Sequence, residues 1–153
     1  MKTLYILAFW LVAAMPLFAQ TFDEKKQWVR EKYTQVESNL DTFTKKSYLD
    51  QPDPDYPPMG YYYFWFNSEN QVVKAIYSMG EEGYSNESNY YFMEGKLFFV
   101  YRVSCEPDWE SENFAQDCTQ YRTYLYNEKV FDCLYKDVKT SDKGKYIPNK
   151  QLK

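Results

Sequence analysis

Residues 91–98 read Tyr-Phe-Met-Glu-Gly-Lys-Leu-Phe, and the same pattern returns at residues 124–131 as Tyr-Leu-Tyr-Asn-Glu-Lys-Val-Phe. Each copy has an aromatic run, a short polar pair and a second apolar run, which is the pattern of a β-hairpin with a tight turn. A looser copy with a longer turn covers residues 64–74. Three successive hairpins predict about six antiparallel strands, arranged most simply as a meander.

The segment from residue 22 to residue 46 carries the only long helical pattern in the sequence. Its apolar residues recur every three or four positions, which lines one face of a helix. They are Val29, Tyr33, Val36, Leu40 and Phe43. Thr21 followed by Glu24 predicts a capping box at the start. The expected fold class is therefore α+β, with an N-terminal amphipathic helix packed on a curved antiparallel sheet of about six strands.

The first nineteen residues have the layout of a secretory signal, with Lys2 before an apolar run and Ala19 as a small residue for cleavage. The run is shorter than the roughly 20 residues that span a bilayer, which argues against a membrane anchor. We expect residues 1–19 to be a signal peptide, 20–135 a single α+β domain, and 136–153 a polar, flexible tail. The mature chain is expected to be a monomer in the periplasm or outside the cell, with no membrane span.

The tight turns predict which residues pair across the hairpins. If each turn has two residues, Phe92 lies opposite Leu97 and Tyr90 opposite Phe99 in one hairpin, and Tyr124 lies opposite Phe131 in the next. The two hairpins then align with Phe99 opposite Tyr124. Both sheet faces then receive apolar side chains, Phe92, Leu97, Phe99 and Phe131 on one and Tyr91, Phe98, Val100 and Leu134 on the other. One helix covers one face, so the other is either closed by curvature or exposed as a Tyr-rich platform.

The same register sets Cys105 directly opposite Cys118. Opposed residues in antiparallel strands have Cα atoms ~4.5–5.5 Å apart, within disulfide range. Cys133 lies out of reach of both. Since an exported chain meets oxidising conditions, we predict a Cys105–Cys118 disulfide and a buried free thiol at Cys133.

Several classes of function are excluded or disfavoured by composition. The chain has no histidine, so it holds no Ser-His-Asp triad, no Cys-His pair and no histidine-based metal or haem site. Its net charge of −4 argues against binding nucleic acid. The five glycines form no phosphate-binding loop, and prolines interrupt the acidic residues of 50–60, which indicates a connector rather than a calcium loop. No cofactor and no metal are predicted.

The loop at 106–117, between two of the cysteines, is the strongest candidate for a binding site. It carries five carboxylates and no basic residue, with two aromatic side chains among them. The candidate residues are Glu106, Asp108, Trp109, Glu110, Glu112, Phe114 and Asp117. Charge steers a basic protein towards such a loop, and a buried aromatic anchor dominates affinity. We predict an exported, non-enzymatic binding protein that recognises a basic protein surface, although an ordinary exposed hairpin loop has the same composition.

Two other functions stay open. Tyr rings stack on sugars and peptides, so an exposed Tyr-rich sheet face predicts a carbohydrate- or peptide-binding module. Paired carboxylates catalyse glycoside hydrolysis, which makes a small hydrolase the third candidate. Its carboxylates would come from Glu81 with Glu82, from residues 50–55, or from Glu110 with Glu112. No catalytic residue is assigned, because solvated acidic side chains are the rule in such loops.

The order of these features resembles a loosely defined group of small exported proteins of Gram-negative bacteria with aromatic hairpin repeats. The resemblance rests on a signal ending Phe18-Ala19-Gln20, a helix with Tyr33 and Leu40, and the phrase Tyr-Tyr-Phe-x-x-Gly-Lys-Leu from residue 90. The phrase is also weakly similar to MORN-type repeats, although its spacing is longer and the required glycines are missing. The resemblance implies export and a hairpin fold, and it transfers no catalytic residue.

Overall fold

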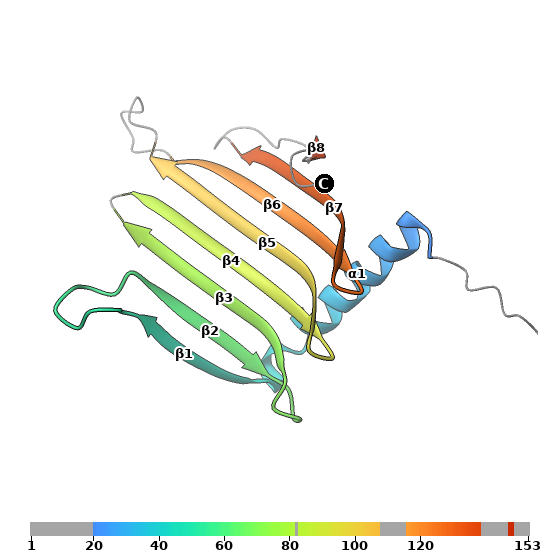
Figure 1. Ribbon diagram of the computed structural model, residues 1–153, viewed down its shortest axis with the longest axis horizontal. Coiled ribbons are helices and arrows are strands. Elements are labelled where there is room, and N and C mark those ends of the chain that lie inside the picture. Colours follow the sequence, from blue (N-terminus) through green and yellow to red (C-terminus); the bar gives the residue numbers. More distant parts are fainter. Residues whose placement is uncertain (1–19, 82, 108–115, 139–146, 149–153) are drawn as a thin grey trace, which may run out of the picture.

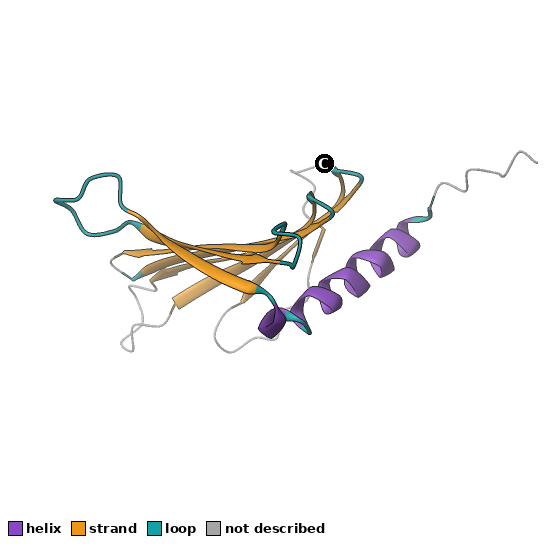
Figure 2. Cartoon of the chain, turned by 90° about the horizontal axis from the view of Figure 1, so that it is seen from below, coloured by secondary structure: helices purple, strands orange, loops and turns teal. Residues whose placement is uncertain are grey.

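The computed structural model describes residues 20–81, 83–107, 116–138 and 147–148, and places one helix on one face of one antiparallel sheet (Figures 1 and 2). The helix α1 (Phe22–Glu37) is followed by a 3-10 turn, Leu40–Thr42. The strands are β1 (Thr44–Asp50), β2 (Gly60–Phe66), β3 (Val72–Glu81), β4 (Tyr84–Met93), β5 (Lys96–Pro107), β6 (Gln116–Tyr126), β7 (Lys129–Val138) and β8 (Ile147–Pro148). Each strand pairs with the next along the chain. The predicted α+β meander is confirmed, with two more strands than expected, β1 and the two-residue β8.

The helix begins where the sequence predicts and ends early. Thr21 and Glu24 form the capping box, with the Thr21 N–H donating to Glu24 Oε2 at 2.7 Å and the Glu24 N–H donating to Thr21 Oγ1 at 3.3 Å. The helix stops at Glu37, where the Asn39 side-chain amide donates to the carbonyl oxygen of Gln35 at 2.7 Å. Asn side chains that bond the backbone in this way compete with helix propagation. The helix expected to reach residue 46 was therefore too long.

The residues after the helix form β1, which pairs with β2 from Thr44 opposite Phe66 to Asp50 opposite Gly60. Residues 51–59 connect these two strands, as the prolines of this segment require. The polar connector predicted here is therefore the loop of an additional hairpin.

The two tight turns each have a left-handed backbone at both central residues, with φ of 52° and 74° at Glu94 and Gly95, and 48° and 61° at Asn127 and Glu128. This is the geometry of the turns that join twisted strands. Just after each turn the second strand carries one unpaired residue, Phe98 or Phe131, again 33 positions apart. Val73 has the same place in the β2–β3 hairpin. Such bulges bend a strand and increase its twist.

These bulges shift the register within each hairpin by one residue. Phe99 lies opposite Tyr91 rather than Tyr90, and Tyr124 lies opposite Asp132 rather than Phe131. The pairings of Tyr90 with Phe99 and of Tyr124 with Phe131 were wrong, because they assumed an uninterrupted ladder, while the predicted pairing of Phe92 with Leu97 beside the turn is confirmed. The alignment between hairpins is confirmed, with Phe99 opposite Tyr124.

The core lies between α1 and strands β4 to β6. Phe98 and Phe99 are both buried, although they are consecutive, because the bulge interrupts the alternation of side chains along β5. The Tyr33 ring packs at 5.1 Å from Tyr91 and 5.6 Å from Phe99, and Phe99 packs at 5.2 Å from Tyr124. Val29 and Val36, two of the predicted helix residues, are buried against this cluster.

Ion pairs connect both ends of α1 to the sheet. Lys26 Nζ lies 2.8 Å from Asp132 Oδ2 on β7, and Glu37 Oε1 lies 2.7 Å from Lys74 Nζ on β3. The Tyr91 hydroxyl also donates to Glu37 Oε1, at 2.8 Å. Asp132 and Lys74 are almost fully buried. Because the helix supplies a cation at one end and an anion at the other, a helix docked in the reverse direction would bring like charges together.

Ionisation of Tyr91 makes the stability of the fold depend on pH in the alkaline range. Its pKa is raised, first by burial and then by its hydrogen bond to the Glu37 carboxylate. Above about pH 10 the unfolded chain releases this proton and the folded chain retains it, so stability falls as pH rises. We expect Tyr91→Phe to lose stability less steeply than the wild type above pH 10, measured as urea midpoints along a pH series. Equal slopes for the two proteins would contradict this.

The predicted disulfide is present between Cys105 on β5 and Cys118 on β6, with Cα atoms 4.0 Å apart. Cys133 is a buried free thiol, as expected. The predicted boundary at residues 135/136 lies inside β7, which runs to Val138, and residues 147–148 of the predicted tail pair with β7. Residues 1–19, 139–146 and 149–153 lie outside the described part of the chain. Within the described part, no helix is long and apolar enough to cross a membrane.

Candidate functional site

Two of the seven residues predicted to form an acidic binding loop lie in the described part of the chain. Glu106 and Asp117 face each other at the ends of β5 and β6, next to the disulfide, and both are exposed. Asp108, Trp109, Glu110, Glu112 and Phe114 lie outside the described residues. Recognition of a basic protein by this loop therefore stays a prediction.

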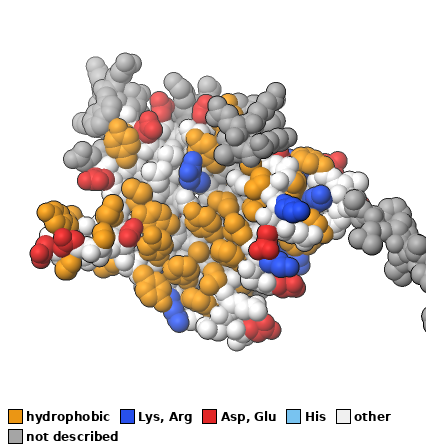
Figure 3. All heavy atoms as spheres, in the orientation of Figure 1, with side chains coloured by type: hydrophobic (Ala, Val, Ile, Leu, Met, Phe, Trp, Pro, Cys, Tyr) orange, Lys and Arg blue, Asp and Glu red, His pale blue; other side chains and the backbone are white. Residues whose placement is uncertain are grey.

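The sheet face opposite α1 displays a continuous group of aromatic rings (Figure 3). The register sets Tyr48, Tyr62 and Tyr77 in one row across β1, β2 and β3, with Phe64 in the adjacent row. Ring centroids are 4.6 Å apart between Tyr62 and Tyr77, 5.8 Å between Tyr48 and Phe64, and 6.4 Å between Tyr62 and Phe64. We call these four residues the aromatic face.

The rings of the aromatic face are held in place and still meet solvent. The Tyr77 hydroxyl donates to Asp50 Oδ2 at 2.8 Å, and this hydrogen bond raises the pKa of Tyr77. A Cβ atom on Gly60 would lie 2.9 Å from the Tyr77 ring, so glycine is required for the ring to rest there. Tyr48 is 53% exposed and Tyr62 is 36% exposed. Of the two possibilities for the uncovered sheet face, the described residues of β1 to β3 fit the exposed platform.

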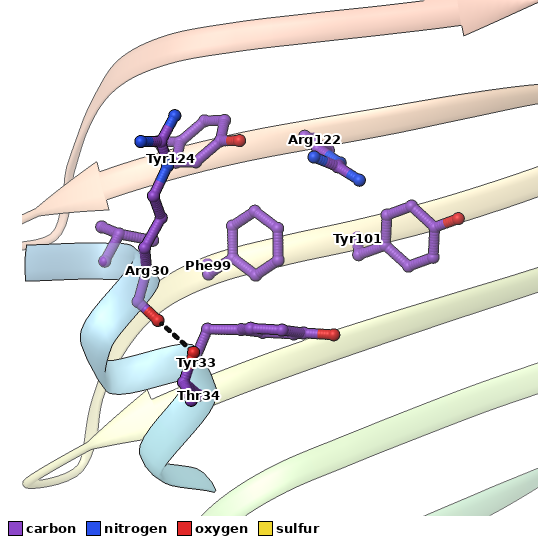
Figure 4. Close-up of a pocket in the computed structure, with 8 residues that line it drawn as sticks. Arg30, Tyr33, Thr34, Phe99, Tyr101, Arg122 and Tyr124 are labelled. Atoms are coloured by element: carbon purple, nitrogen blue, oxygen red, sulfur yellow. Dashed lines mark hydrogen bonds between the residues drawn. The ribbon is translucent and has the colours of Figure 1, made fainter. Parts of the chain in front are cut away.

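A pocket of about 530 Å³ lies on the other side of the sheet, between α1 and strands β5 and β6 (Figure 4). The helix contributes Val29, Arg30, Tyr33 and Thr34, and the sheet contributes Phe99, Tyr101, Arg122 and Tyr124. In Figure 4 the Tyr33 ring projects from α1 over the sheet. The Arg122 guanidinium lies 5.8 Å from the centroid of Tyr101, which it faces across β5 and β6.

The described residues of the two surfaces include no group of metal ligands. Among the described residues, no three His, Cys, Asp or Glu side chains lie close enough together to hold a metal ion. Of the carboxylates considered for hydrolysis, Asp50 accepts the Tyr77 hydroxyl, while Glu82, Glu110 and Glu112 lie outside the described residues. Aromatic stacking and charge pairing are the chemistry that the two surfaces offer.

The sequence patterns located neither the aromatic face nor the pocket, for a different reason in each case. Tyr48 lies just after the segment predicted as a helix, and residues 44–49, Thr-Lys-Lys-Ser-Tyr-Leu, lack the alternation of polar and apolar side chains that signals a strand, so β1 was not predicted. The pocket combines helix and sheet residues, which depends on how α1 docks. A search of known protein families, curated proteins and solved structures finds no match to this chain.

Proposed function

We propose that this protein is an exported carbohydrate-binding module that holds a glycan on its aromatic face. The observation that carries the proposal is the row of Tyr48, Tyr62 and Tyr77, with Tyr48 and Tyr62 exposed and Tyr77 half-buried, on a sheet face that α1 does not cover. Export is supported by the Cys105–Cys118 disulfide, since such bonds persist in oxidising compartments.

The chemistry of the aromatic face suits a sugar. Aromatic rings offer flat apolar surfaces for the C–H faces of sugar rings, while phenol hydroxyls form hydrogen bonds at their edges. The Asp50 carboxylate lies beside the Tyr77 hydroxyl and is an acceptor for sugar hydroxyls. Lys46, opposite Phe64 on the edge strand, adds a donor on the same face. Neutral polymers need this mixture of rings and single polar groups rather than a field of one charge.

A bound peptide is the second candidate, because β1 is an edge strand of the sheet. Edge strands are protected by lysines, and β1 carries Lys45 and Lys46 side by side. The Lys45 ammonium lies 4.5 Å from the Tyr63 ring and 4.9 Å from the Trp65 ring, on the opposite sheet face from Lys46. These lysines disfavour addition of a peptide strand, so the glycan is the better supported ligand.

The test compares two neighbouring tyrosines on β2. Tyr62 belongs to the aromatic face, while Tyr61 is 44% exposed and its side chain points to the other face of the sheet. Affinity gels and calorimetry with a panel of soluble polysaccharides should find a bound glycan, and Tyr62→Ala should weaken its binding about fivefold, since a ring contact contributes about 1 kcal/mol. Tyr61→Ala should leave the affinity unchanged.

Three results would overturn the proposal. The first is equal loss of affinity for the Tyr61 and Tyr62 variants, and the second is the absence of binding across the polysaccharide panel. The third is a stable dimer in light scattering that Tyr62→Ala converts to monomer, because the rings would then belong to an interface between two copies.

A further inference from the structure

We propose that the glycan is a linear, ribbon-like polysaccharide that lies across the strands, from Tyr48 on β1 to Tyr135 on β7. This inference rests on the proposed function and extends it from the aromatic face to the whole width of the sheet. It also names the class of glycan, an extended chain of β-1,4-linked sugars whose rings present flat apolar faces.

The first argument is a row of side chains that crosses seven strands and is mostly tyrosine. The row of Tyr48, Tyr62 and Tyr77 continues through the register of β4 to β7, which lie side by side in Figure 1. Its further members are Ser88, Arg102, Tyr121 and Tyr135. The β-bulges lie closer to the hairpin turns and leave this row intact.

The part of the row on β5 to β7 has surface that a ligand can reach. Arg102 is exposed, and its guanidinium lies over the Tyr121 ring, 4.6 Å from the centroid. Tyr121 and Tyr135 are half-buried, as Tyr77 is. A guanidinium stacked on a ring keeps its N–H groups at the edge of its plane, where they donate to hydroxyl oxygens. The row therefore offers aromatic rings at both ends and a hydrogen-bond donor between them.

The second argument is a row of polar side chains beside the tyrosines on the same face. Its polar members are Asp50, Asn86, Ser104, Thr119 and Asp137. The carboxylates at its two ends each accept a hydroxyl, Asp50 from Tyr77 at 2.8 Å and Asp137 from Thr119 at 3.2 Å. Polar side chains of these kinds pair with sugar hydroxyls, while aromatic rings cover the apolar faces of sugar rings. The two parallel rows thus suit the edge and the face of a ribbon-like sugar chain.

The third argument is the length of the row. Neighbouring strands lie ~4.8 Å apart, so a row across seven strands is about 29 Å long. One sugar ring of an extended β-1,4-linked chain is about as long as one strand spacing, so successive rings can lie over successive strands. The whole row then holds about six rings, whereas the tyrosines of β1 to β3 alone hold about three.

The experiment measures affinity against chain length by calorimetry of the full mature chain. The probes are cello-, xylo-, manno- and N-acetylchito-oligosaccharides of two, three, four and six units. We expect at least one series to bind, and its affinity to rise more than about fivefold from three units to six, because rings are added over β4 to β7. Maltohexaose, whose α-1,4 linkages coil the chain, should bind more weakly than the β-1,4-linked hexamer.

The position of the hexamer is tested in the wild type and in matched variants. Amide NMR shifts caused by the hexamer should extend over β1 to β7 of the wild type, a result that depends on no substitution. Tyr121→Ala and Tyr135→Ala should each weaken the hexamer about fivefold. Tyr63→Ala removes a half-buried tyrosine from the opposite face, where Lys45 lies over its ring, and should leave binding unchanged.

The outcomes separate this inference from the proposed function. Equal affinity of trimer and hexamer, equal binding of maltohexaose, or shifts confined to β1 to β3 would overturn the inference, while a loss of affinity in Tyr62→Ala kept the proposed function. Binding of a different polysaccharide but none of the four series would overturn the class of glycan. Absence of binding to every polysaccharide would overturn both proposals.

Discussion

Replacing Glu37 by alanine is expected to lower the free energy of unfolding by about 3 kcal/mol. The change removes the carboxylate that pairs with Lys74 and accepts the Tyr91 hydroxyl. Lys74 is 6% exposed, so its charge would remain in the interior without this partner. Breaking a buried ion pair from one side costs about 3–5 kcal/mol, and Glu37 is only partly buried, which places the effect at the lower end.

Urea unfolding of two further variants checks this origin. Glu31 is an exposed glutamate of the same helix, where it accepts a hydrogen bond from Gln27, so Glu31→Ala should change stability by less than about 0.5 kcal/mol. Lys74→Met in the Glu37→Ala background should recover part of the loss, because it removes the isolated charge. Equal effects of Glu37→Ala and Glu31→Ala would show that the contact with Lys74 has no influence on stability.

Removing the Cys105–Cys118 disulfide is expected to lower the free energy of unfolding by about 3 kcal/mol, as much as Glu37→Ala. The Cys105–Cys118 bond closes a loop with a sequence separation of 13 residues, and loops of this length correspond to about 3 kcal/mol in the chain-entropy description. The double variant Cys105→Ser/Cys118→Ser should therefore unfold at clearly lower urea concentration than the oxidised wild type.

The reduced wild type is the control for this prediction. It keeps both cysteine side chains and should unfold at the same urea concentration as the double variant. Cys133 should supply the single thiol that becomes reactive when the oxidised protein is unfolded. An unchanged midpoint on reduction would contradict the stabilising role, and a proteolytic fragment that links Cys133 to either partner would contradict the pairing.

The sequence predicted the hairpins, the disulfide and the start of the helix because each depends on local chemistry. Turn residues, aromatic runs and the Thr21–Glu24 capping pair act over a few positions. The existence of β1 depends on pairing with β2, which a helical periodicity continuing through Leu40 and Phe43 conceals. The bulges were missed because apolar residues stand on both sides of Phe98, so either register gives an acceptable pattern.

The candidate sites were predicted less well than the fold. An exposed Tyr-rich face followed from counting more apolar positions than one helix covers, but its location on β1 to β3 required the strand at residues 44–50. The pocket needed the docking position of α1, which is set by two ion pairs between residues far apart in the sequence, Lys26 with Asp132 and Glu37 with Lys74. No local pattern identifies such partners.

The β-bulges at Val73, Phe98 and Phe131 recur with the hairpin repeat, so the sheet can become wider by the addition of whole hairpins. Each of the three repeated hairpins, β2–β3, β4–β5 and β6–β7, carries its own bulge just after its turn, so a chain with one more such hairpin would gain two strands that bend and twist in step with the rest. The single helix covers a fixed width. Any added hairpin would therefore enlarge the uncovered surface, and the area available to a ligand would grow with the number of repeats while the helix-covered core stayed the same.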